Sequence, residues 1–113
     1  KYDIGHGYTS CVTQPYVMEY NRPASADKQA VLARAAGVQT DGMDDTTVAE
    51  AVYQVVDDFI LGLGMPHRLR ELEIPMDDLR EIAELTMEDG AGRNNPVPIT
   101  SSEQVMEVLK KAW

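Results

Sequence analysis

"TVAEAVYQVVDDFILGL", residues 47–63, is the stretch that decides the fold class. Its apolar residues recur at every third or fourth position, the spacing that places side chains on one face of an α-helix. Thr47 and Glu50 have the spacing of a capping box, which predicts that the helix begins here. Because the apolar stripe is broad, we expect the helix to pack into the core, with Phe59, the only phenylalanine of the chain, at the centre.

The remaining sequence predicts further helices on the same grounds. Residues 8–20 predict one bent helix or two short ones, because Pro15 lies in the middle. A loop, "NRPAS", is expected to follow, with Ser25 capping a helix that stops at Gly37. The other predicted elements are one helical turn over 67–72, a helix over 76–88, and a last helix that starts at the capping-box spacing Thr100–Glu103.

No stretch alternates between apolar and polar residues in the way that predicts a β-strand. The fold class is therefore all-α, a compact bundle of five to six helices joined by short loops. At 113 residues, the chain is long enough for one hydrophobic core and too short for two. Residues 1–113 are thus expected to form a single helical domain.

Charge and cysteine content exclude several classes of function. Ten Lys and Arg stand against nineteen Asp and Glu, mixed along the chain, so neither a nucleic-acid surface nor an anionic membrane is a predicted partner. Cys11 is the only cysteine and is interpreted as a small apolar filler in a reducing compartment. Without a membrane-length apolar run or a signal peptide, the protein is expected to be cytoplasmic.

Two histidines are the candidates for chemistry. His6 lies between two glycines, which remove side-chain bulk beside it; the alternative is a loop or capping histidine. His67 lies among charged residues and is interpreted as a solvated capping residue. Neither has a second histidine at metal-ligand spacing, so no complete metal site is encoded locally. The acidic pairs at 44–45, 57–58 and 77–78 are interpreted as capping or solvent-facing residues.

Three segments, taken in order, resemble the C-terminal helical domain of iron-containing (group III) alcohol dehydrogenases, which share the dehydroquinate synthase-like architecture. The family pattern of His-Gly, then Pro, a Val-Met pair and an aromatic residue before Asn is matched by "HGYTSCVTQPYVMEYN", residues 6–21. "LGMPHRLRELEI", residues 63–74, is similar to the family's Gly-hydrophobic-Pro turn and Leu-Arg helix. "NNPVPITSSEQVMEVLKKAW", residues 94–113, is similar to its Asn-Pro loop and last helix.

The resemblance implies a metal site. In the family, one Asp and three His hold a catalytic divalent metal, and the last of these histidines is followed by Gly; the matching position is His6. The metal is iron, or zinc as the alternative, because both accept similar ligand sets. It would act as a Lewis acid on the substrate oxygen while hydride passes between an alcohol or carbonyl substrate and NAD(P).

The same resemblance implies missing parts. The family's other metal ligands and its dinucleotide-binding domain lie upstream, and this chain starts with Lys1 rather than Met. We therefore expect a C-terminal fragment of a longer enzyme, inactive alone and without a tightly bound metal. Its partners would be the N-terminal domain of the same protein and a small alcohol, aldehyde or ketone. Family members are commonly oligomeric, so a homo-oligomer is also implied.

The loop "EDGAGRNNP", residues 88–96, supplies a second candidate. In the resembling family the matching Asn-Pro loop precedes the last helix of the domain that faces the cleft. Arg93 is therefore predicted to bind an anionic substrate or a cofactor phosphate through its planar guanidinium; the alternative is a solvated surface loop.

Two other functions remain open from the sequence. The chain is alternatively a free-standing acidic helical interaction domain in which His6 is a loop residue. It is also compatible with a metal-free or maleylacetate reductase-like relative that reduces a different carbonyl. Gln14, Pro15 and Tyr16 stand where the family usually has Leu-Pro-His, which leaves the substrate subclass open.

Overall fold

The computed structural model describes residues 2–113, apart from the side chain of Ala91. The described residues contain helices and no strands, which confirms the all-α prediction. The α-helices are α1 (His6–Ala35), α2 (Asp45–Gly62), α3 (Leu79–Glu88) and α4 (Ser102–Ala112). The 3₁₀ helices are η1 (Leu69–Leu72), η2 (Met76–Asp78) and η3 (Gly90–Asn94).

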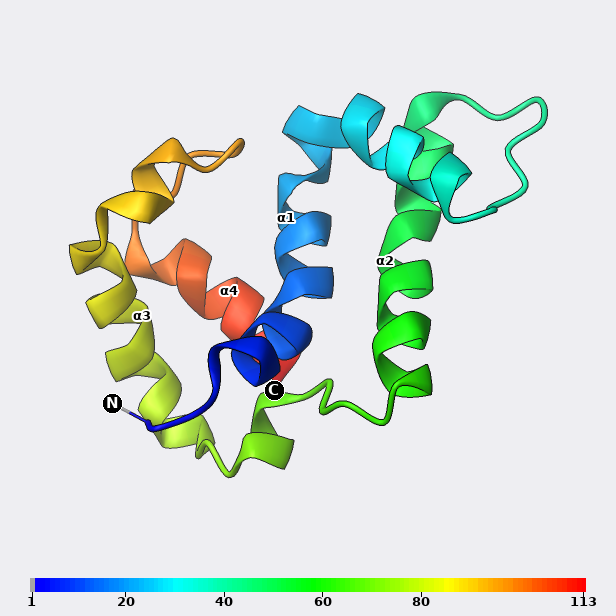
Figure 1. The fold of residues 1–113 in the computed structure, drawn as a ribbon. Coiled ribbons are helices and arrows are strands. Elements are labelled where there is room, and N and C mark those ends of the chain that lie inside the picture. The colour runs from blue at the N-terminus through cyan, green and yellow to red at the C-terminus, as the bar shows by residue number, and fades with distance from the viewer. Residues whose placement is uncertain (1) are drawn as a thin grey trace.

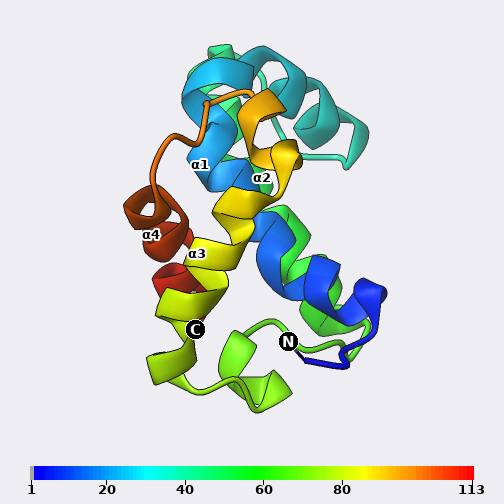
Figure 2. The same cartoon turned by 90° about the vertical axis from the view of Figure 1, so that its left-hand side faces the viewer.

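The long helix α1 is the centre of the fold (Figure 1). Helix α2 packs along one side of α1, while α4 packs on the other side and is itself covered by α3. The side view shows the segment between η3 and α4 passing beside the middle of α1 (Figure 2). None of the helices described is long and apolar enough to span a bilayer.

Helix α1 differs from its prediction because it continues through the segment predicted as a loop. Both Pro15 and Pro23 lie inside it, and regular geometry is interrupted only at Ser25 (φ −140°, ψ 20°), where two helices meet at a bend. The expected bend at Pro15 is thus displaced to the region after Pro23. Gly37, at φ 84°, has the left-handed conformation predicted for the residue that ends the helix.

Polar side chains support this bend from inside the protein. The Ser25 hydroxyl donates a hydrogen bond to the carbonyl of Asn21 (2.8 Å), so it does not cap the second half of the helix as predicted. The Gln29 amide donates to the Met18 carbonyl (2.7 Å) and to the Ser25 hydroxyl (3.0 Å). These side-chain bonds give buried carbonyls next to the bend hydrogen-bond partners.

Two hydrophobic clusters form the core. The larger one joins the first half of α1 to α3, α4 and η1, and includes Val12, Tyr16, Leu69, Ile74, Leu79, Ala83, Val105, Leu109 and Ala112. The smaller one lies where both halves of α1 meet α2, and comprises Met18, Ala30, Ala33, Val48 and Val52. The bent form of α1 therefore creates a second core region that a straight helix would not enclose.

The prediction that Phe59 lies at the centre of the core is wrong. Its side chain is 67% exposed, and Leu63 on the same stripe is 61% exposed. The apolar face of α2 is wider than the surface that α1 covers, so only part of it, with Val48 and Val52, is fully buried. The uncovered part, with Phe59, borders an apolar groove of about 390 Å³ between α1 and α2.

Neither helix is capped at the residues that the sequence predicted. Helix α2 begins earlier than predicted, because the Asp44 carboxylate accepts a hydrogen bond from the Thr47 backbone N–H (2.8 Å). This bond holds the pKa of Asp44 below its usual value. Helix α4 has its capping box one residue later, at Ser101 and Gln104, whose side-chain oxygen accepts from the Ser101 N–H (3.1 Å).

Candidate functional site

His6 is the first residue of α1 and is exposed to solvent. Its backbone is held by the helix, since its carbonyl accepts a hydrogen bond from the Ser10 hydroxyl (2.9 Å). No hydrogen bond or ion pair of its imidazole occurs within residues 2–113. The Cα of His6 is thus held by a rigid helix, while its imidazole is free to contact a group outside the described residues.

The glycines beside His6 are not explained by backbone conformation, because neither has a positive φ. A Cβ on Gly7 would meet nothing within 4 Å in this chain, and one on Gly5 would lie 3.3 Å from the ring of Tyr8. The space on the Gly7 side of His6 is therefore open among the described residues.

The described residues contain no group of three or more His, Cys, Asp or Glu side chains that could hold a metal ion. His6 can accordingly contribute one ligand, and the remainder of any metal site has to come from elsewhere.

His67 lies apart from His6 and is half-buried rather than solvated. Its Nδ1 is 3.6 Å from the Asp57 carboxylate and its Nε2 is 3.6 Å from the Glu71 carboxylate. Asp57 is itself buried, with 8% of its surface exposed, so the solvent-facing interpretation of the 57–58 pair is wrong for this residue. Through these contacts His67 connects the C-terminal part of α2 to η1, so its role in this chain is structural.

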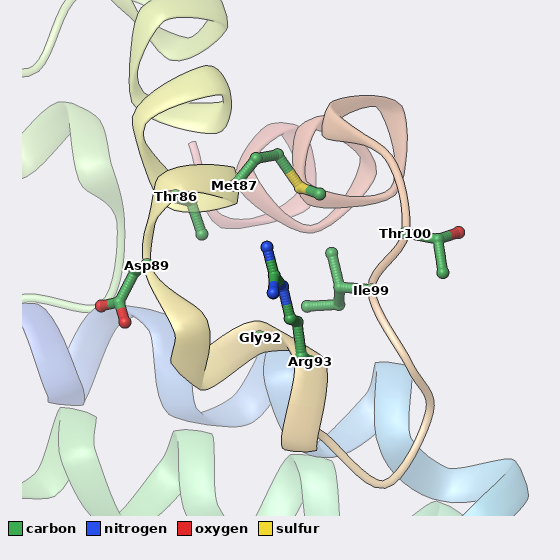
Figure 3. Close-up of a pocket in the computed structure, with 7 residues that line it drawn as sticks. All are labelled: Thr86, Met87, Asp89, Gly92, Arg93, Ile99 and Thr100. Carbon is green, nitrogen blue, oxygen red and sulfur yellow. The ribbon is translucent and has the colours of Figure 1, made fainter.

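Arg93 belongs to a pocket of about 360 Å³ between the end of α3, η3 and the segment before α4. Its guanidinium points into the pocket toward Thr86, Met87 and Ile99, whereas the Asp89 carboxylate points away (Figure 3). No ion-pair partner of Arg93 is found among the residues described. Arg93 thus offers an uncompensated positive charge beside apolar side chains, an arrangement suited to an anionic group.

The Arg93 pocket adjoins a larger one that reaches the first turns of α1. This second pocket has a volume of about 450 Å³ and is mostly apolar. It shares Thr86 and Asp89 with the Arg93 pocket and is also lined by Thr9 and Thr13, which follow His6 on α1. His6 lines neither pocket, so the structure places the two candidate residues at separate positions of one connected surface.

A family model, described as the C-terminal part of the Fe-containing alcohol dehydrogenase family, matches residues 1–113. The chain belongs to this family. The iron-containing alcohol dehydrogenase relationship holds over the whole chain, and the resemblance drawn from residues 6–21, 63–74 and 94–113 is confirmed.

Curated relatives with similar sequences are much longer than this chain. A 1,3-propanediol dehydrogenase of Citrobacter freundii is 30% identical over 112 residues, which cover 99% of this chain and 29% of that protein. A lactaldehyde reductase of Escherichia coli is 28% identical with the same coverage. Alcohol dehydrogenase 4 of Saccharomyces cerevisiae is 29% identical over 114 residues, 99% of this chain and 28% of that protein. The chain thus spans less than a third of these relatives.

Solved structures show the same fold. A 1,3-propanediol oxidoreductase superposes with a TM-score of 0.92 at 27% identity, covering 99% of this chain and 29% of that one. An alcohol dehydrogenase from Oenococcus oeni superposes with a TM-score of 0.90 at 28% identity, covering 98% and 29%. The α1–α4 arrangement is therefore the fold of this part of iron-containing alcohol dehydrogenases.

One polar contact at the Arg93 loop was not predicted from the sequence. Asn21, the last residue of the first family-like motif, and Asn95, in the Asn-Pro loop, bind each other through their side-chain amides. Both residues are present in the quoted motifs, but their 74-residue separation carries no local signal that they meet.

Proposed function

We propose that this chain is the C-terminal part of a metal-dependent, NAD(P)-linked alcohol dehydrogenase and that His6 is one of its metal ligands. The whole-chain family match carries the proposal. The structure is consistent with it, because the His6 imidazole is exposed, uncommitted and attached to a rigid helix terminus. Imidazole nitrogen suits both iron and zinc, so the donor fits either metal.

The position of His6 at the start of α1 suggests separate roles for the metal and for the helix. A bound divalent metal supplies Lewis-acid polarisation of the alcohol or carbonyl oxygen during hydride transfer to or from the nicotinamide. Helix α1 orients the His6 ring through the backbone of its first turn, and the open space at Gly7 admits the groups that complete the site. Because the chain holds one such ligand, we infer that it is inactive without the remainder of the polypeptide.

Replacing His6 in the full-length polypeptide tests the ligand assignment. His6→Ala is expected to lower bound metal and turnover together while leaving the helical content unchanged, since the imidazole makes no contact that the fold needs. His67→Gln is the matched control, because it removes the chain's other histidine, and it is expected to keep the metal. Full metal content in His6→Ala would contradict the assignment.

Arg93 is proposed to bind the anionic part of a substrate or a phosphate of the nicotinamide cofactor. The supporting observation is its guanidinium, which has no ion-pair partner among residues 2–113 and points into a pocket (Figure 3). Arg93→Ala is expected to raise one Michaelis constant several-fold without a change in melting temperature. Arg80→Ala, at an exposed arginine that pairs with Glu103 (3.2 Å), is the control and is expected to leave every Michaelis constant unchanged.

The partner proposed for the exposed apolar groove between α1 and α2 is the preceding part of the same polypeptide. Relatives contain more than twice as much sequence outside the matched region as within it, and this remainder needs a surface to pack against. The groove, lined in part by Leu32, Val55 and Phe59, provides an apolar one. We also propose a homo-oligomer for the full-length enzyme, on the family relationship alone.

A further inference from the structure

The bend in α1 contains a chain of buried polar side chains. Asn21, Ser25 and Gln29 are each more than nine-tenths buried. Gln29 donates to Ser25, and Ser25 donates to the carbonyl of Asn21. Buried polar groups of this kind destabilise a protein unless their hydrogen bonds are satisfied, so a connected network fixes one geometry. The network holds Asn21 in a defined position at the end of the first half of α1.

Asn21 uses its side chain to bind the loop that follows η3. Its Nδ2 donates to Oδ1 of Asn95 (2.9 Å), and Nδ2 of Asn95 donates back to Oδ1 of Asn21. The backbone N–H of Val97 also donates to Oδ1 of Asn21 (3.4 Å). Asn95 closes the contact by donating to the Val97 carbonyl (2.7 Å). We call this set of bonds the Asn21–Asn95 clasp.

The clasp secures the short segment that carries Arg93. The Gly92 carbonyl accepts hydrogen bonds from the Asn95 N–H (3.3 Å) and the Ile99 N–H (3.5 Å), which closes residues 92–99 into a compact loop. Arg93 lies inside this loop, and no ion pair with another described residue holds its guanidinium. The backbone of the loop sets the point from which the Arg93 side chain extends, and the clasp connects that backbone to α1.

We propose that Asn21 is a positioning residue that acts through Asn95 to aim Arg93 at its anionic ligand. The inference rests on the proposed function of Arg93. A guanidinium binds a carboxylate or phosphate bidentately only when both N–H groups are aligned with it, so a mobile loop would lose affinity. Because the clasp belongs to the same helix that begins at His6, it sets the Arg93 loop relative to the proposed metal ligand.

The geometry predicts unequal effects of two similar substitutions. Asn21→Asp keeps an oxygen that accepts from Asn95 Nδ2 and from the Val97 N–H, loses the one donated bond, and places a single carboxylate oxygen beside Oδ1 of Asn95. Asn95→Asp loses every bond that Nδ2 donates and places a carboxylate oxygen near the Asn21 and Val97 oxygens. Asn95→Asp is therefore expected to loosen the loop more than Asn21→Asp does.

The test combines two measurements on the full-length enzyme and three variants, Asn21→Ala, Arg93→Ala and the double variant. Hydrogen–deuterium exchange reports how firmly residues 92–99 are held, without reference to activity. Steady-state kinetics with NAD, NADP and each accepted substrate report Michaelis constants and kcat. Asn94→Ala is the matched control, because this neighbouring asparagine is exposed and makes no side-chain hydrogen bond with another described residue.

We expect Asn21→Ala to speed exchange in residues 92–99 and to raise the same Michaelis constant that Arg93→Ala raises, with kcat nearly unchanged. The double variant should show no further increase beyond Arg93→Ala, because the clasp acts through that residue. Arg93→Ala alone and Asn94→Ala should leave exchange unchanged. If Asn21→Ala fails to fold, the predicted order of Asn95→Asp and Asn21→Asp in both measurements takes its place.

Two results would overturn the inference without touching the role of Arg93. One is unchanged exchange in Asn21→Ala, which would show that the clasp does not hold the loop. The other is faster exchange with unchanged Michaelis constants while Arg93→Ala still raises one, which would leave a clasp with a structural role alone. A third result, no effect of Arg93→Ala on any Michaelis constant, would overturn the proposed function of Arg93 and the inference with it.

Discussion

Replacing Phe59 with alanine measures how much of the α2 face is buried within this chain. Truncating a fully buried phenylalanine costs about 3–5 kcal/mol of unfolding free energy. Phe59 is 67% exposed, so about one third of its side chain contributes to packing. Scaling the range by that fraction gives about 1–1.7 kcal/mol for Phe59→Ala. Leu79, which is fully buried, is the reference, and Leu79→Ala should cost about 2–5 kcal/mol.

Urea denaturation of the purified chain 1–113, followed by far-ultraviolet circular dichroism, gives both values under the same conditions. The expected result is a clearly smaller shift of the midpoint for Phe59→Ala than for Leu79→Ala, with equal slopes. Equal losses in the two variants would refute the argument, because Phe59 would then be buried in solution. In the full-length polypeptide, the Phe59→Ala loss should rise toward the fully buried range if the preceding sequence covers the groove.

Three further outcomes follow from single groups. Burial, with a contribution from Tyr53, raises the pKa of Tyr16 far above its usual value, so the free energy of unfolding should fall as the pH rises above about 10. Tyr16→Phe should make this fall smaller, which urea midpoints measured across the pH range would show. The hydrogen bond from the Thr47 N–H lowers the pKa of Asp44, so the stabilising effect of this carboxylate should be present above about pH 4 and lost on further acidification. Asp44→Asn still caps the helix but does not titrate, so this variant should lose less stability in acid. Acid unfolding curves of the two proteins measure the difference. His6 has no partner ligands among the described residues, so calorimetry of the chain with zinc should show no site of micromolar affinity. A micromolar zinc site would contradict the interpretation of His6 as a single ligand.

The sequence alone determined the features that depend on neighbours a few residues apart. The spacing of Val48, Val52 and Ile60 predicted helix α2, and Gly37 marked the end of α1, because periodicity and backbone preference are local properties. The family relationship was likewise readable from three short motifs. The capping boxes were misplaced, since several Ser, Thr and Asp residues next to each helix start are competent to cap it and their spacing alone does not choose among them.

Tertiary structure decided which faces are covered and which distant residues meet. Phe59 shares a stripe with buried residues, yet it is exposed because the two halves of α1, which meet at Ser25, cover only part of the apolar face of α2. The bend lies at Ser25 rather than at Pro15, and there Gln29 donates to the carbonyl of Met18, eleven residues earlier. The Asn21–Asn95 clasp and the separation of His6 from the Arg93 pocket likewise arise from helix packing. Contacts over such distances are set by the angles at which whole helices pack, and no local pattern of residues contains those angles.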